Sequence, residues 1–268
     1  MTDSPAAGAL LRQWRQRRRL SQLDLAIEAD VSSRHLSFIE TGRARPTSDM
    51  ILRLAEHLDV PLRERNKLLL AGGFAPAYAE RALAGPELAS VRAALRRVLA
   101  GHEPYPALII NRHWELVDAN APVALLTRGA AAHLLQPPVN VLRLSLHPDG
   151  MAPRIANLTQ WRAHLLSRLQ HQVQATGDPV LASLHEELTG YPGGAAGPSG
   201  GRTQPTSAAA DVIVPLRYQP SPGVELSFIS MTAVVGTPMD ITVQELAIES
   251  FYPADDVTAA ALAGAASG

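Results

Sequence analysis

Apolar residues recur at intervals of three and four through residues 8–75, in short runs separated by polar turns. The first run contains Leu11 and Trp14, and the last ends near Gly72-Gly73. Spacing of this kind places apolar side chains on one face of a helix. The pattern therefore predicts five short helices packed around one small core.

Residues that favour helix ends stand between these runs. Ser21 precedes the second helix and Asp24 follows three positions later, a pair typical of a capping box. Ser32 and Thr47 are placed to cap the third and fourth helices. Gly42 suits the left-handed residue that ends the third helix. These residues support the predicted helix boundaries.

Beyond this helical region the chain mixes two kinds of pattern. Residues 76–104 contain a linker and then a helix over about 87–100, and residues 191–210 are expected to form a disordered loop rich in Gly, Pro, Ser and Ala. The predicted strands are 107–111, 114–118, 211–218, 224–235 and 245–252, and the predicted helices are 158–173 and 178–188. We therefore expect a second, α+β domain.

The predicted strand 224–235 changes its pattern half-way along. At first apolar and polar residues alternate, so that Val224, Leu226 and Phe228 are predicted to point inward and Glu225 outward. Further on, both faces of the strand are apolar. Strands that are covered on both sides have this pattern. Helices or a partner subunit are therefore expected to cover its far side.

Charge is divided unevenly along the chain. Residues 1–75 carry 12 Lys and Arg against 9 Asp and Glu, whereas residues 76–268 carry 12 against 16. This division suits a nucleic-acid-binding domain joined to a domain that does not touch nucleic acid. The chain has no cysteine, which excludes disulfides and thiolate metal sites. Because no apolar run has the length of a membrane helix or the form of a signal peptide, we expect a cytoplasmic protein with no membrane partner.

Residues 21–46 read SQLDLAIEADVSSRHLSFIETGRARP. This segment resembles the XRE family of phage-repressor-like helix-turn-helix proteins, whose pattern is Gln-x-x-Leu-Ala, then Val-Ser, then Leu/Ile-Ser-x-Ile-Glu-x-Gly, and finally Pro. The resemblance covers residues 8–75 and implies a transcription regulator that binds double-stranded DNA. Asp30 and Asp59 stand where the family usually has glycine in a left-handed turn. Aspartate tolerates that conformation better than most residues.

The resemblance also implies which residues contact DNA. The third helix would be the recognition helix, with its N-terminal half in the major groove. Gln22 is placed to bind a phosphate, and Arg34 could contact guanine with two hydrogen bonds. The candidate DNA-binding residues are Gln22, Ser32, Ser33, Arg34, Ser37, Phe38, Thr41, Arg43 and Arg45.

Some of these roles have alternatives. Phe38 either touches a thymine methyl group or packs against the protein, and Arg15 and Arg17–Arg19 are interpreted as a solvated face rather than as base readers. Because one small domain contacts few base pairs, we expect a homodimer on a palindromic operator. Its half-sites would be about 34 Å apart.

The second half of the chain carries a further resemblance. Residues 61–78 and 105–127 are similar to parts of XRE proteins that carry an MmyB-like ligand-binding domain, and the similarity continues through Trp161 to about residue 257. It implies a PAS-like sensor, and in that family the pocket can hold a fatty-acid-like ligand. The alternative is that the aromatic residues and Met are ordinary core residues. The candidate ligand-binding residues are Trp114, Trp161, Leu165, Phe228 and Met231.

The remaining motifs do not indicate catalysis or metal binding. Gly197–Gly201 matches the pattern G-x-S-x-G, but no strand precedes the serine and no helix follows it. His164 and His171 share a helix face but lie about 10 Å apart, too far to bind one metal ion. A turn explains His147 and Asp149. We therefore expect no enzyme activity, no cofactor and no metal.

The expected architecture is multidomain. An all-α, five-helix, phage-repressor-like domain (8–75) is followed by a linker and connecting helix (76–104) and a PAS-like α+β sensor and dimerisation domain (105–257). The leading hypothesis is a sequence-specific transcription regulator controlled by a small apolar ligand. The alternative is a regulator whose second domain mediates protein interaction or dimerisation and binds no small ligand.

Overall fold

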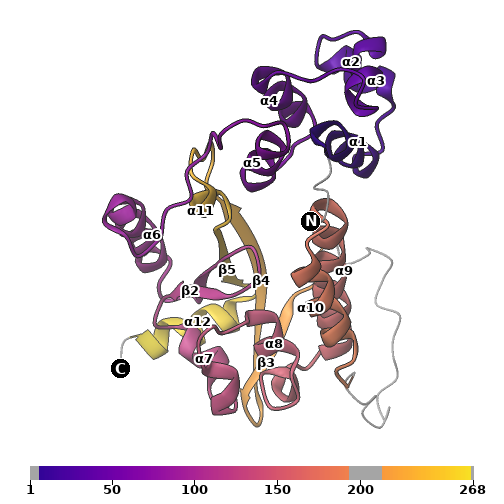
Figure 1. Cartoon of the computed structure of the whole chain (residues 1–268). Coiled ribbons are helices and arrows are strands. Elements are labelled where there is room, and N and C mark those ends of the chain that lie inside the picture. The colour runs from indigo at the N-terminus through magenta and orange to yellow at the C-terminus, as the bar shows by residue number, and fades with distance from the viewer. Residues whose placement is uncertain (1–5, 193–212, 267–268) are drawn as a thin grey trace. The chain divides into compact units, whose positions relative to one another are not determined.

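The computed structural model describes residues 6–192 and 213–266. The chain divides into two compact units (Figure 1). The first comprises the described residues up to Glu87 together with Gly236–Gln244, and the second comprises Leu88–Val235 and the described residues from Glu245 onward. The 197–201 motif and most of the predicted loop 191–210 lie outside the described residues.

Five short helices form most of the first unit, which confirms the predicted helical domain. The Ser21 hydroxyl accepts a hydrogen bond from the Asp24 N–H and the Asp24 carboxylate accepts one from the Ser21 N–H, so the capping box is present. Thr47 caps the fourth helix. The helices are α1 (Ala7–Arg17), α2 (Gln22–Glu28), α3 (Ser33–Glu40), α4 (Ser48–His57) and α5 (Leu62–Ala71). The buried core includes Leu11, Trp14, Leu25, Leu36, Ile39, Ile51, Leu54, Leu58, Leu68 and Leu69.

Backbone geometry at three positions allows these helices to pack. Helix α1 approaches α3 so closely that a Cβ atom on Gly8 would lie 1.9 Å from the carbonyl oxygen of Ile39. Only glycine fits there without a shift of one helix. Asp30 and Asp59 have φ angles of 52° and 46°, so the expected left-handed turns at these aspartates are present.

A segment from late in the chain completes the first unit. Helix α11 (Ile241–Gln244) packs against α5, where the Gln244 Oε1 atom accepts a hydrogen bond of 2.8 Å from the Leu62 N–H. Asp240 is 95% buried and forms an ion pair of 3.0 Å with Arg81. No sequence pattern indicated this placement, because it depends on contacts between residues far apart in the chain.

The second unit is built on one antiparallel sheet of order β2-β1-β5-β4-β3, which confirms the α+β class. The strands are β1 (Ala107–Ile110), β2 (Leu116–Ala119), β3 (Leu216–Ser221), β4 (Val224–Val234) and β5 (Ala247–Pro253). The helices are α6 (Ala89–Gly101), α7 (Val123–Thr127), α8 (Val141–Leu146), α9 (Leu158–Thr176), α10 (Pro179–Thr189) and α12 (Asp256–Ala266). Short 3-10 turns lie at Pro86–Leu88, Ala132–Leu135 and Ala152–Arg154. Helices α9 and α10 pack together, and α12 packs on β4 and β5.

Strand β4 differs from its prediction at both ends. Val224 was expected to point inward but is 44% exposed, because it directly follows the turn at Gly223. Leu226 and Phe228 are buried, as the alternation predicted. In the second half of the strand Met231 and Val234 are exposed, although Arg168 of α9 reaches Thr232 between them.

Candidate DNA-binding surface and ligand cavity

The N-terminal half of α3 presents polar side chains to solvent. Leu36 and Ile39 are buried in the core, which turns Ser33 and Arg34 outward. Ser32 is the N-cap of α3, and its hydroxyl accepts a hydrogen bond of 3.1 Å from the His35 N–H. The exposed face of α3 is therefore the face available to a DNA groove, and Ser32 also has a structural role.

Three arginines at and after this helix have free guanidinium groups. Arg34, Arg43 and Arg45 are exposed, and none forms an ion pair with another described residue. The Arg34 Cζ atom lies 5.4 Å from the centre of the half-buried Phe38 ring. Phe38 thus packs beside Arg34 at the edge of the surface, which supports its alternative as a packing residue.

Arg15 departs from the expected solvated face. It is buried, and its guanidinium donates to both carboxylate oxygens of Glu40 over 2.6 Å and 2.7 Å. Burial alone would raise the pKa of Glu40, but hydrogen bonds from Arg15 and Gln22 outweigh it and lower that pKa. The pair ties α1 to the end of α3 and makes Arg15 a structural residue.

Gln22 is anchored by the same carboxylate. Its Nε2 atom donates a hydrogen bond of 2.8 Å to Glu40 Oε2, so one of the donors of the amide predicted to bind phosphate is already engaged. The Gln22 side chain is half-buried at the first residue of α2. Glu40 therefore fixes the orientation of Gln22, and only its remaining amide valences could meet a phosphate.

The second unit contains an apolar cavity of about 80 Å³ between the sheet and its helices. Trp114, Trp161 and Leu165, three of the candidate ligand-binding residues, line it. Phe228 is fully buried but does not line the cavity; it packs edge-on against Phe251, which does. Met231 is 58% exposed and lies outside the cavity, because alternation along β4 places Ser230 at the cavity instead.

Trp114 has an unusual backbone at the cavity wall. Its φ angle is 64°, and it lies in the turn before β2 rather than in the strand predicted over 114–118. A bulky residue in this region is strained. The indole N–H holds it in place with a hydrogen bond of 2.7 Å to Gln172, and its carbonyl accepts one from Val141. The indole ring is thus fixed at the cavity.

One end of the cavity is charged. Arg168 forms an ion pair with Glu249, which is 95% buried, and Thr232 also bonds to both side chains. The Arg168 Cζ atom lies 4.5 Å from the centre of the Trp114 ring. Sequence reasoning missed this cluster, although Glu249 stood out as an acid within a mostly apolar strand.

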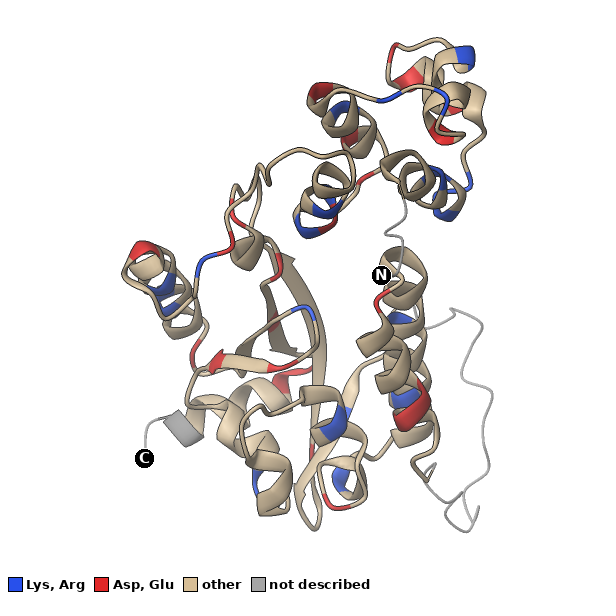
Figure 2. Ribbon diagram, in the orientation of Figure 1, with Lys and Arg blue, Asp and Glu red and all other residues tan. Residues whose placement is uncertain are grey.

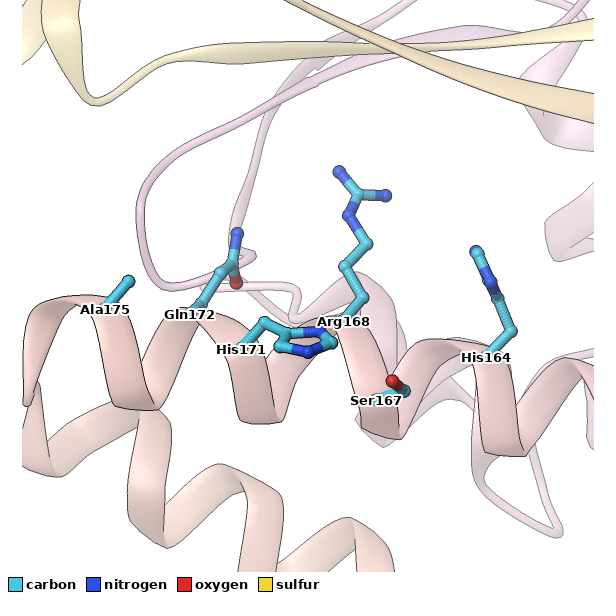
Figure 3. Close-up of a pocket in the computed structure, with 6 residues that line it drawn as sticks. All are labelled: His164, Ser167, Arg168, His171, Gln172 and Ala175. Atoms are coloured by element: carbon cyan, nitrogen blue, oxygen red, sulfur yellow. The ribbon is translucent and has the colours of Figure 1, made fainter. Parts of the chain in front are cut away.

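A shallow groove of about 460 Å³ follows the face of α9 beside this charged end. Arg168 lines both the groove and the cavity, and Figure 3 shows its side chain extending from α9 together with Gln172 and His164. His164 stacks on Trp161 at 5.6 Å, and burial together with Arg168 lowers its pKa. The groove therefore combines mostly apolar surface with one arginine and a few polar groups.

His133, His147 and Asp149 form the group in the described chain that most resembles a metal site. Their ligand atoms lie within 4.8 Å of one another. However, the Asp149 N–H donates a hydrogen bond of 3.0 Å to His147 Nδ1, which occupies that lone pair. The arrangement is that of a turn, as the sequence suggested for His147 and Asp149.

Comparison with known families identifies both units. A model described as the MmyB-like transcription regulator ligand binding domain matches residues 91–264, and one described as a helix-turn-helix domain matches residues 6–68. The chain belongs to the MmyB-like transcription regulators. The described cavity and charged cluster of this MmyB-like regulator lie within the region that matches the ligand-binding domain.

Solved structures give only distant likenesses. The crystal structure of the clp gene regulator ClgR from Corynebacterium glutamicum is 23% identical, with a TM-score of 0.22, over 37% of this chain and 90% of that chain. The structure of an RNA-binding light-oxygen-voltage receptor is 15% identical, with a TM-score of 0.25, over 98% of this chain and 64% of that chain. No curated protein matches the chain.

The matched domains are those of a DNA-binding transcription regulator. Among the helices that the structure describes, none combines the length and the hydropathy that a bilayer-crossing segment needs.

Proposed function

We propose that this MmyB-like regulator binds a specific palindromic operator as a homodimer, under the control of an apolar ligand in its second unit. The observation that carries the DNA-binding part is the exposed, unpaired guanidinium of Arg34 on the outward face of α3. Arginine in this position can donate two hydrogen bonds to guanine O6 and N7. Arg34 is therefore the proposed base reader.

The other candidate residues have supporting roles in this proposal. Arg43 and Arg45 follow α3 and are exposed, so they are placed to neutralise phosphates. Ser33 lies beside Arg34 on the exposed face. The Thr41 hydroxyl donates a hydrogen bond of 2.7 Å to the Ser37 carbonyl, which links these two candidate residues. Gln22, held by Glu40, can meet a phosphate together with the free N–H groups at the start of α2.

Binding to an operator selected from random DNA tests this assignment. Arg34→Ala should cost about 1–3 kcal/mol on the selected site and relax preference at one base position. Arg43→Ala should weaken all sequences alike and reduce the salt dependence by about one unit of log–log slope. Arg96→Ala, an exposed arginine on α6 of the second unit, is the control. Unchanged affinity and preference for Arg34→Ala would contradict the placement of the recognition helix.

Ligand control is supported by how the cavity connects to the first unit. Strands β4 and β5 line the cavity through Ser230, Glu249 and Phe251, and the chain between them is Gly236–Gln244, which packs with the helix-turn-helix unit. Movement of β4 and β5 is thus transmitted along the chain to α5. A ligand that binds one arrangement more tightly would then change operator affinity.

The size of the cavity restricts which ligands fit. Ligand pockets commonly have volumes of roughly 300–1,000 Å³, whereas this cavity measures about 80 Å³. A medium-chain fatty acid therefore requires the cavity to open, and the adjoining groove, which shares Arg168, is the direction with space. The proposed ligand thus has an apolar chain, and binding it changes the protein's shape.

Thermal-shift and native mass-spectrometry measurements with medium-chain fatty acids test the ligand. Ser230→Leu should fill the cavity and abolish the ligand-dependent rise in Tm, whereas Ser183→Leu, on an exposed part of α10, should not. A bound ligand should also change operator affinity by about 1–3 kcal/mol. If the fatty acids raise the Tm of neither wild type nor the variants, the second unit is a protein-interaction domain rather than a sensor. The small volume of the cavity favours this alternative.

A further inference from the structure

The second half of β4 has an open edge. Strand β3 pairs with β4 only from Val224 to Phe228, whereas β5 pairs with β4 on its other side from Phe228 to Val234 (Figure 1). Beyond Phe228, no strand in the described parts of the chain pairs with the β3 side of β4. Among the described residues, no strand takes up the N–H and C=O groups of Ile229–Val234 on that side, a stretch of about 20 Å.

This edge lacks the features by which proteins usually protect open strands. Such edges commonly carry lysine or another charge, a proline or a bulge. Ile229–Val234 contains no charged residue (Figure 2). It also contains no proline, and its pairing with β5 shows no register shift. Met231 and Val234 are 58% and 70% exposed. An apolar, neutral edge of this kind favours pairing over solvation.

We propose that Ile229–Val234 pairs with the same segment of a second copy of this chain, extending the sheet across a two-fold axis. This inference rests on the homodimer of the proposed function and names its surface. A strand that pairs antiparallel with its own copy is two-fold symmetric, as a closed dimer requires. Such symmetry places the residue at the axis opposite its own equivalent, so a charge there would meet a like charge, and an uncharged segment avoids this repulsion.

The geometry of this dimer also fits binding to a palindromic operator. Two helix-turn-helix units on a palindromic site are related by a two-fold axis, and the paired β4 strands supply one. A six-residue edge buries little area compared with a stable interface of roughly 1,200–2,000 Å². The free protein should therefore dimerise with a Kd in the micromolar range, and operator DNA should strengthen the association.

Sedimentation velocity of the full chain tests the surface. Met231→Lys places a charge in the middle of the open edge and should weaken dimerisation about tenfold or more. Val224→Lys is the matched control, because Val224 is also exposed on β4 but lies where β3 already pairs. Both positions are at the surface, so circular dichroism and Tm should stay close to wild type.

A single-cysteine variant provides a second measurement. The chain has no cysteine, so Met231→Cys, at the middle of the segment, introduces the only thiol. Paired β4 strands bring equivalent Cα atoms near the two-fold axis within disulfide range, so oxidation should produce a covalent dimer. Val224→Cys should remain a monomer on a non-reducing gel.

The possible outcomes separate this surface from the rest of the proposed function. A wild-type chain that stays monomeric, with and without operator, overturns both the homodimer and the surface. A wild-type dimer that Met231→Lys does not weaken overturns the surface alone. If residues 193–212 of the same chain or another protein occupied the edge, Met231→Lys would leave the oligomeric state unchanged, which also overturns the proposal.

Discussion

The Arg15–Glu40 ion pair allows a quantitative test of how the helix-turn-helix unit is held together. Both side chains are at least 90% buried, and the guanidinium and carboxylate make two hydrogen bonds of 2.6 Å and 2.7 Å. Removing one partner leaves a buried charge uncompensated, which costs about 3–5 kcal/mol. Arg15→Met and Glu40→Leu should each lose this much stability.

Replacing both partners should be far less damaging. An apolar pair of similar volume avoids the desolvation penalty of both ions, so Arg15→Met/Glu40→Leu should remain within about 2 kcal/mol of wild type. The double-mutant cycle should then give a coupling energy of at least about 3 kcal/mol. Gln22 would lose its anchor in the double variant, so operator affinity should fall moderately even though the fold is retained.

Hydrogen exchange of α1 and α3 amides in the full chain measures these losses for the first unit alone. The control is Lys67→Met in the same unit, since the Lys67 Nζ atom lies 2.7 Å from Glu64 Oε1 at the surface of α5. A surface pair contributes about 0–1 kcal/mol. If Glu40→Leu cost no more than Lys67→Met, or if the double variant were as unstable as the single ones, the argument from burial would be refuted.

Three further predictions follow from individual contacts. Gly8→Ala should destabilise the first unit by at least about 2 kcal/mol in the same exchange measurement, because its Cβ would overlap the Ile39 carbonyl. Gly236→Ala, in the same unit and with open space around it, should be within about 0.5 kcal/mol of wild type. Because the pKa of Glu40 is lowered on folding, its contribution to the free energy of unfolding is present above its ordinary pKa and is lost as pH falls through the lowered pKa. The free energy of unfolding of the Arg15→Met/Glu40→Leu variant should therefore fall less steeply in acid than that of wild type. An unchanged acid dependence would exclude Glu40 as its cause. Gln244→Ala removes the hydrogen bond to the Leu62 N–H. It should reduce the change in hydrogen exchange of β4 and β5 that operator binding causes, while operator affinity stays within about twofold of wild type. An unaltered exchange response would show that Gly236–Gln244 does not transmit the change.

The fold could be predicted where its determinants are local. Ser21 with Asp24, Thr47 and the apolar stripes specify helices within a few residues of where the structure has them. The strands were harder, because β3 runs on to Ser221 and Trp114 sits in a turn with positive φ. Pairing in a sheet depends on distant partners, and no local pattern reports those partners.

The candidate sites show the same division between local and distant information. Arg34 follows from the helix-turn-helix motif, and its exposure follows from the burial of Leu36 and Ile39 on the other face. Periodicity placed Phe228 inward but could not show that Ser230, two residues later, is the one that reaches the cavity. The pairing of Arg168 with Glu249, 81 residues apart, needed the tertiary fold.

Strand β4 links the proposed ligand, dimer and DNA sites through one element. Ser230 lines the cavity, Thr232 bonds to the Arg168–Glu249 pair, and the chain leaves β4 directly into Gly236–Gln244 of the helix-turn-helix unit. A ligand that enlarges the small cavity must move some of its walls, and β4 and α9 are among the elements that form them, through Ser230 on β4 and Leu165 and Arg168 on α9. If β4 moves, the open edge and the connection to α5 move with it, because both are continuous with the strand. Reciprocity then requires that each coupled pair of these events, such as operator binding and ligand binding, has the same coupling free energy in both directions, so one member of a pair can be used to detect the other.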